Sequence, residues 1–204
     1  MLLCDIGNTS YHFYDLHSDY KESVEHFDPS SVKEDVHYIC VQPAIKRELE
    51  KLPNWHNLEE RIDRSDYYDT MGIDRIMACE TIENGVIVDA GSAITVDVVR
   101  DGVFQGGFIY PGFKAFQKAY ASISNALAYE LDTDIDLAHL PKNTPDALAY
   151  GFLSGLVKEI CSYDLDIFLT GGDAVSLQKQ LPKAKVDRLL VFRGMLKSLG
   201  QDVC

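Results

Sequence analysis

The chain has 204 residues, a formal net charge of −13 at pH 7 and the apolar fraction of an ordinary globular protein. This length suffices for one large domain or two small ones around a sizeable core, and the acidic balance argues against a nucleic-acid partner. Five scattered cysteines without a C-x-x-C pair favour reduced thiols in the cytoplasm over a disulfide framework or a zinc site.

The first half of the chain predicts an antiparallel start followed by a parallel strand and two helices. An apolar run begins at Leu2, so we expect no signal peptide, and no run approaches the ~20 residues that span a bilayer. Predicted strands lie at residues 2–5, 11–16, 20–27 and 36–41, with a short one near residues 58–62. Pro43 opens one predicted helix, and a second covers residues 72–83, where Asn84-Gly85 ends it.

The second half of the chain repeats this order. Predicted strands lie at residues 86–89, 94–98, 103–109, 167–170 and 188–192. Predicted helices lie at residues 113–131, 144–161, 175–181 and 194–199, with Thr144 as the expected cap of the second. We expect a domain boundary near Asn84-Gly85, which gives an N-terminal lobe of residues 1–84 and a C-terminal lobe of residues 85–204.

Each half opens with an apolar strand that ends in an aspartate and a glycine turn. We call residues 5–9 the first glycine turn and residues 89–92 the second glycine turn. Glycine lets the backbone come close to a ligand, the following N–H groups can cradle an anion, and the aspartate can hold a divalent cation through water. A single turn of this kind is a weak signal, but two copies at the heads of two half-chains predict a phosphate site with a metal.

These turns and four further motifs resemble type III pantothenate kinases in order and approximate spacing. The motifs are Gly72-Ile73-Asp74-Arg75, which we call the acceptor motif, residues 106–112, Asn143-Thr144 and residues 170–174. The resemblance spans residues 5–174, although Ser92 stands where the family usually has threonine and the chain is short for the family. It implies an α/β, duplicated actin-like ATPase (ribonuclease H-like) fold, with two lobes that each hold a mixed five-stranded sheet flanked by helices.

The resemblance also implies an activity. The protein would transfer the γ-phosphate of ATP to the primary hydroxyl of pantothenate, the first step of coenzyme A synthesis, as a homodimer with the substrate site at the subunit interface. Mg²⁺ and a monovalent cation, potassium or ammonium, would assist. Phosphoryl transfer needs positioning, charge neutralisation and a group that takes the hydroxyl proton.

Asp74 is our candidate for that general base, and its alternative role is an acid that complements a helix N-terminus. By the resemblance, Arg75 would pair with the substrate carboxylate, whereas the residue alone could equally form a surface ion pair with Asp69 or Glu80. A tyrosine just before the acceptor motif touches pantothenate in the family. Tyr68 is the first candidate for it and Tyr67 the second, and either could simply pack in the core.

The remaining candidates also come from the resemblance. Those for ATP binding are Asp5, Ile6, Gly7, Asn8, Thr9, Ser10, Tyr11, His12, Ser92, Gly171 and Gly172. Those for the substrate are Tyr68, Gly72, Ile73, Asp74, Arg75, Gly107 and Thr144, of which Thr144 would come from the partner subunit. Asp5 would hold Mg²⁺ through water and Asp89 the monovalent cation, whereas Asp97 is expected to be structural.

Two other functions fit the same fold. A kinase for another small hydroxyl-bearing metabolite, such as a sugar or acetate kinase, would carry the same pair of glycine turns. A non-catalytic ATP-binding regulator or scaffold would keep the fold and lose the chemistry, but the acids Asp5, Asp74 and Asp89 are all present.

Overall fold

The computed structural model describes residues 1–201, which fall into two compact units. One unit contains Met1–Ile82 together with the C-terminal segment from Leu189, and the other contains Glu83–Arg188. The sequence-based boundary thus lies two residues from this one, but the C-terminal segment, which we expected in the second lobe, packs in the first unit. The physical reason is that the buried face of its helix lies against a helix of the first unit.

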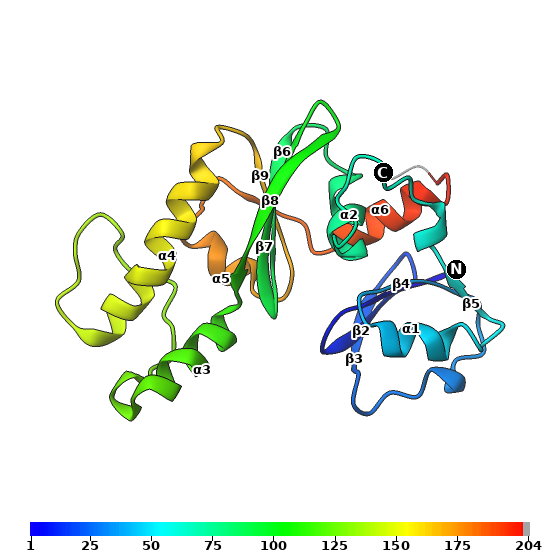
Figure 1. Cartoon of the computed structure of the whole chain (residues 1–204), viewed down its shortest axis with the longest axis horizontal. Coiled ribbons are helices and arrows are strands. Elements are labelled where there is room, and N and C mark those ends of the chain that lie inside the picture. Colours follow the sequence, from blue (N-terminus) through cyan, green and yellow to red (C-terminus); the bar gives the residue numbers. More distant parts are fainter. Residues whose placement is uncertain (202–204) are drawn as a thin grey trace. The chain divides into compact units, whose positions relative to one another are not determined.

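The first unit is built on a mixed five-stranded sheet (Figure 1). The order of its strands is β3-β2-β1-β4-β5. Its strands are β1 (Leu2–Ile6), β2 (Ser10–Tyr14), β3 (Asp19–Ser23), β4 (Val36–Cys40) and β5 (Trp55–Asn57). Strand β1 pairs antiparallel with β2 and parallel with β4, so the predicted parallel strand after an antiparallel start is confirmed.

The second unit repeats this topology, in the order β10-β9-β6-β7-β8. Its strands are β6 (Gly85–Ala90), β7 (Ala93–Arg100), β8 (Val103–Pro111), β9 (Ile167–Thr170) and β10 (Lys185–Val186). In both sheets the first strand of the unit lies centrally, between an antiparallel neighbour and a parallel one. The predicted duplication, with one mixed five-stranded sheet in each unit, is therefore confirmed.

Helices and short 3₁₀ turns complete the two units. They are η1 (Pro29–Ser31), α1 (Pro43–Leu49), η2 (Glu59–Arg61), α2 (Ile73–Cys79), α3 (Phe113–Ile123), η3 (Asn125–Leu127), α4 (Thr144–Ser162), α5 (Ala174–Gln178) and α6 (Leu190–Ser198). Among residues 1–201, no helix has both the length and the apolar character that crossing a membrane requires.

Two predicted elements of the second half are wrong. The run at residues 188–192 was expected as a strand, but it is the start of α6, in which Leu190, Val191 and Phe192 are all buried. A continuous apolar run has no period that separates a buried strand from a buried helix. The helix expected over residues 113–131 ends at Ile123, because Ser124 takes an extended conformation and its side chain caps η3.

Three smaller expectations in the sequence also differ from the structure. The short strand lies at β5 rather than at residues 58–62, where η2 forms instead. Strand β3 ends at Ser23, before the expected residue 27. The cap of α4 is Asn143, whose Oδ1 accepts the N–H of Asp146 at 2.9 Å, and Thr144 is the first helical residue.

Strand alternation decides which face of the first sheet carries Asp5. In β1, Leu2, Cys4 and Ile6 belong to the core cluster that includes Leu49 of α1, so Asp5 lies on the opposite face of the sheet. His12 pairs with Asp5 across the sheet, and its ring lies 4.8 Å from that of Phe192 in α6. Helix α6 therefore covers the face that carries Asp5, and Figure 1 shows α2 beside it.

Candidate active site

The first glycine turn connects β1 to β2 as a tight hairpin. The N–H of Gly7 donates to Ser10 O at 3.1 Å, and Thr9 O accepts the N–H of Val24 at 3.1 Å. A Cβ at Gly7 would meet only Ser10 O, at 3.9 Å, which is ordinary contact. The turn therefore leaves open space over Gly7, where a ligand can approach the backbone.

The candidates after this turn divide by strand alternation. Ile6 and Tyr11 have their side chains in the core, where burial raises the pKa of Tyr11 to about 12, so these side chains are not open to a ligand. His12 lies on the same face as Asp5, and its Nε2 is 2.8 Å from Asp19 Oδ2. The structure thus brings together Asp5, His12 and the turn backbone, and directs the Tyr11 ring away from them.

Gly112 and Gly171, which directly follow strands β8 and β9, lie against the second glycine turn. A Cβ at Gly171 would lie within 3.0 Å of Asp89 Oδ1, and a Cβ at Gly112 within 3.0 Å of Gly91 O, closer than real Cβ atoms come. Gly171 also has a φ of +88°. Hydrogen bonds join the same segments, from Gly112 N–H to Ser92 O at 3.1 Å and from Asp173 N–H to Ala90 O at 2.9 Å. Gly171 therefore lies against the Asp89 carboxylate.

Thr95 adds a polar atom beside Asp89 that sequence reasoning missed. The two residues are direct partners across β6 and β7, so their side chains share one face of the sheet. Within residues 1–201, the buried Oγ1 of Thr95 has no hydrogen-bond partner. A carboxylate, the Ala90 carbonyl and this hydroxyl are oxygen donors, which is the chemistry that a hard cation prefers. The sequence could have predicted this pairing, because Asp89 and Thr95 each lie three residues from Ser92, at the centre of the tight hairpin between β6 and β7.

The acceptor motif forms the N-terminus of α2. Gly72 is the N-cap residue, and Asp74 Oδ1 accepts the N–H of Arg75 at 2.9 Å. A Cβ at Gly72 would lie 2.5 Å from Asp74 Oδ1, so glycine makes room for this carboxylate. Burial raises the pKa of Asp74 above its ordinary value, and the nearby N–H and charge of Arg75 offset only part of that rise.

Arg75 is buried, with 6% of its surface exposed, which excludes the alternative of a surface ion pair. Its Nη1 donates to the hydroxyl of Tyr68, and its guanidinium carbon lies 5.7 Å from the centre of the Tyr68 ring. Tyr68 itself is 44% exposed. Tyr67 is directed elsewhere, because its hydroxyl donates to Glu80 Oε1 at 2.8 Å, at the other end of α2. Tyr68 therefore joins Arg75 at the acceptor motif.

A half-buried ion-pair network holds the segment that leads into the acceptor motif. Arg64 Nη2 donates to the carbonyl of Met71 at 2.7 Å, and Arg64 Nη1 donates to Glu59 Oε1 at 2.9 Å. Lys46 of α1 pairs with the other oxygen of Glu59. These three contacts join residues 5, 7 and 13 positions apart, and no local sequence pattern predicts them.

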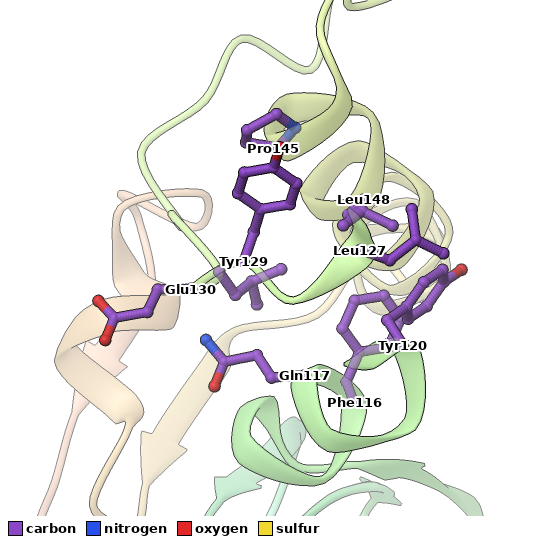
Figure 2. Close-up of a pocket in the computed structure, with 9 residues that line it drawn as sticks. Phe116, Gln117, Tyr120, Leu127, Tyr129, Glu130, Pro145 and Leu148 are labelled. Atoms are coloured by element: carbon purple, nitrogen blue, oxygen red, sulfur yellow. The ribbon is translucent and has the colours of Figure 1, made fainter. Parts of the chain in front are cut away.

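Gly107 and Thr144 belong to other elements of the second unit than the second glycine turn. Gly107 is opposite Asp97 in the edge strand β8, and Asp97 is buried, with 1% of its surface exposed, as its expected structural role requires. Thr144 begins α4. A small pocket near that end of α4 (Figure 2) is lined by Phe116, Gln117, Tyr120, Leu127, Tyr129, Glu130, Leu131, Pro145 and Leu148. One of its lining residues, Pro145, directly follows Thr144 in the chain.

The described residues, 1–201, contain no group of three or more His, Cys, Asp or Glu side chains arranged to hold a metal ion. Mg²⁺ usually keeps several waters and binds through one or two carboxylates plus substrate phosphates.

Comparison with known proteins identifies the family. The family model described as Type III pantothenate kinase matches residues 50–163. A protein of Sulfurimonas denitrificans named Type III pantothenate kinase is 55% identical over 195 residues, which cover 96% of this chain and 95% of that protein. One of Wolinella succinogenes with the same name is 43% identical, over 98% of this chain and 97% of its own length. Relatives of similar length therefore share the shortness noted above.

A solved structure extends this similarity to the whole fold. It belongs to a Campylobacter jejuni protein described as a Baf family transcriptional activator, is 38% identical and superposes with a TM-score of 0.89, over 98% of both chains. The family-model match includes the second glycine turn and the acceptor motif. The chain therefore belongs to the type III pantothenate kinase family.

Proposed function

We propose that the protein phosphorylates pantothenate with ATP, which yields 4′-phosphopantothenate and ADP in the first step of coenzyme A synthesis. The observation that carries this proposal is 55% identity over nearly the whole length of a type III pantothenate kinase, together with the acceptor motif at the N-terminus of α2. The substrate offers a carboxylate and a primary hydroxyl, and the motif offers a cation and a base.

Asp74 is the proposed general base. The pantothenate hydroxyl gives its proton to the Asp74 carboxylate as its oxygen bonds to the γ-phosphorus and the bond to the ADP oxygen breaks. A carboxylate with a raised pKa is a stronger base than an exposed one, which favours this role. Gly72 supports it as well, because only glycine leaves space for the carboxylate in its observed position.

Arg75 and Tyr68 are proposed to bind the carboxylate end of pantothenate. A guanidinium presents five N–H donors in one plane, and Tyr68 fixes that plane from one side through its hydroxyl and its ring. Gly72 and Ile73 supply backbone at the same place, and Gly107 stays a proposed contact from the family.

We expect Tyr68→Phe to raise KM for pantothenate about tenfold and to leave KM for ATP within twofold, because one hydrogen bond to a charged group is worth about 1.5–3 kcal/mol. Tyr67→Phe is the matched control, because it removes the bond to Glu80 instead. That variant should lose thermal stability and keep both KM values. Steady-state kinetics with each substrate varied in turn measures the difference, and a larger effect from Tyr67→Phe would reverse the assignment.

ATP is proposed to bind at the two glycine turns. Gly7, Asn8, Thr9 and Ser10 would contact the phosphates through backbone N–H groups and hydroxyls, with Ser92 at the γ-phosphate. Asp5 would orient the waters of Mg²⁺, which neutralises phosphate charge when it is bound. Asp89, with the Ala90 carbonyl and the Thr95 hydroxyl near it, has the oxygen donors that suit potassium or ammonium. Gly171 and Gly172 complete the proposed nucleotide contacts.

A homodimer in the cytoplasm completes the proposal. Apolar side chains of the second unit, among them Ile109, Ile123, Tyr129 and Leu140, are between 44% and 76% exposed, which supports a contact with a second copy. Thr144 would then reach the partner's substrate. The thiols of Cys4, Cys40 and Cys79 are buried, as suits a reducing compartment.

Release of ADP by the purified protein tests the function. We expect release that depends on pantothenate and rises with potassium, and much weaker release with sugars, acetate or other small hydroxyl-bearing metabolites. Release with one of those compounds in preference to pantothenate would assign a different kinase activity on the same fold.

A non-catalytic regulator is the second candidate, because the Campylobacter jejuni structure is described as a transcriptional activator. The net charge of −13 opposes direct binding to DNA. ATP binding without pantothenate-dependent release of ADP would favour this candidate over the kinase.

The pH dependence of turnover should reflect Asp74. The base works only when it is ionised, and burial raises its pKa, so kcat/KM should fall on the acid side at a higher pH than an ordinary aspartate would give. A pH–rate profile between pH 4 and 9 measures that limb. An acid limb at the ordinary aspartate value, near pH 4, would contradict the assignment.

A further inference from the structure

Gln42 occupies the N-cap position of α1 but does not cap its own helix. Its side chain makes no cap hydrogen bond, and Nε2 instead donates to the carbonyls of Gly7 at 2.7 Å and Asn8 at 3.2 Å. Both acceptors belong to the first glycine turn, 35 and 34 residues earlier in the chain. A carbonyl oxygen only accepts hydrogen bonds, so the group of Gln42 that faces both carbonyls is its NH₂ group and not its amide oxygen.

Sheet pairing places Gln42 beside the turn. Strands β1 and β4 run parallel with Ile6 opposite Cys40, and the N–H of Val41 donates to Ile6 O at 3.1 Å. The C-terminal ends of β1 and β4 therefore lie at the same edge of the sheet. The N–H of Gln42 is also 3.4 Å from the sulfur of Cys40, which holds its backbone in place.

The two hydrogen bonds determine where the N–H groups of the turn point. In a planar trans peptide the carbonyl of one residue and the N–H of the next point in opposite directions. Gln42 draws the carbonyls of Gly7 and Asn8 to its side, so the N–H groups of Asn8 and Thr9 point away from it. Neither N–H donates to an acceptor within residues 1–201. Successive N–H groups with a common direction form an anion-binding concavity.

We propose that Gln42 is a positioning residue for ATP, which holds the first glycine turn in the conformation that binds the phosphates. It acts through the backbone of Asn8 and Thr9 and does not touch the nucleotide itself. This inference rests on the proposed function, because it takes the turn to be the phosphate site.

Gln42→Met tests the inference, because methionine keeps the length of the side chain and removes both donors. We expect KM for ATP, and Kd for ATP measured by calorimetry, to rise about tenfold, which corresponds to 1.4 kcal/mol. KM for pantothenate and kcat should stay within twofold. Gln42→Glu, which also lacks a donor and adds negative charge near the phosphates, should raise Kd for ATP further and keeps the test valid if one variant folds poorly.

Gln180 offers a matched control in the second unit. Its Nε2 also bridges two loop carbonyls, those of Thr133 at 2.7 Å and Ile135 at 2.8 Å. Gln180→Met should lower thermal stability about as much as Gln42→Met does and leave the ATP constants unchanged. Equal ATP constants for the two variants, or an equal rise in both KM values of Gln42→Met, would overturn the inference. Failure of the proposed function would instead appear in the wild type, and Kd for ATP would still test the role of Gln42.

Discussion

Replacing Asp74 with asparagine is expected to lower kcat by about 10²–10⁴-fold, the usual contribution of a general base. Asparagine has the same shape, and its Oδ1 can still accept the N–H of Arg75, so α2 should keep its N-terminus. ATP affinity should stay within twofold, because the first glycine turn is untouched. Steady-state turnover and calorimetry with ATP measure the two effects separately.

The same substitution should not reduce stability at neutral pH. Burial raises the folded-state pKa of Asp74 above the unfolded value, so the contribution of this carboxyl to stability is fully present below the unfolded pKa and is lost as pH rises through the folded pKa. At neutral pH the ionised carboxylate therefore destabilises the fold. Asp74→Asn should consequently have a Tm equal to or above that of the wild type.

Asp69→Asn provides the matched control for this prediction. Asp69 is an exposed acid five residues before Asp74, and its replacement removes the same charge from the same segment. Turnover of this variant should remain within twofold of the wild type. Near-normal turnover in Asp74→Asn, or an equal loss in both variants, would remove Asp74 from the role of base.

The sequence predicted the parts of the fold that depend on local periodicity. Strand β1 alternates between core and opposite face, and β6 repeats its pattern, so both the duplication and the direction of Asp5 and Asp89 follow from nearby residues. The start of α6 did not follow, because residues 189–192 are continuously apolar. Its membership of the first unit depends on packing against α2, a contact between residues more than 100 positions apart.

The candidate site divides in the same way. The acceptor motif and the glycine turns are short segments, and each was visible as a pattern of a few residues. The sequence does not distinguish Tyr67 from Tyr68, because the two adjacent tyrosines differ only in what their hydroxyls reach in the structure. Gln42, Arg64 and Thr95 were missed for a related reason, since each acts through partners on another strand or loop.

Gly194→Ala is expected to destabilise the protein and to reduce turnover together. Gly194 is buried in α6, and a Cβ there would lie within 3.0 Å of the backbone of Met77 in α2. Main-chain atoms cannot rotate away as a side chain can, so the two helices must separate. Overpacking of this kind costs about 1–3 kcal/mol, and for a chain of this size a loss of 3 kcal/mol corresponds to a fall in Tm of roughly 6–12 °C.

Turnover should also fall, because α2 contains both Met77, which the new Cβ would meet, and Asp74. Met77 lies one helical turn after Asp74, so a shift of α2 away from α6 also moves the carboxylate that would accept the proton. A displacement of about 1 Å can reduce catalysis 10²-fold. The loss should appear in kcat at a temperature well below the Tm of the variant, where the folded fraction is complete.

Gly151→Ala is the matched control, because it makes the same substitution inside another helix, α4. A Cβ at Gly151 would meet open space, so only the higher helix propensity of alanine acts, and stability should rise by about 0.5–1 kcal/mol. Opposite signs for the two variants would establish that the contact at Met77, and not the loss of a glycine as such, governs Gly194. If Gly194→Ala matched Gly151→Ala in Tm and turnover, α6 would have no part in holding α2, and the orientation of Asp74 would depend on the Arg64 network alone.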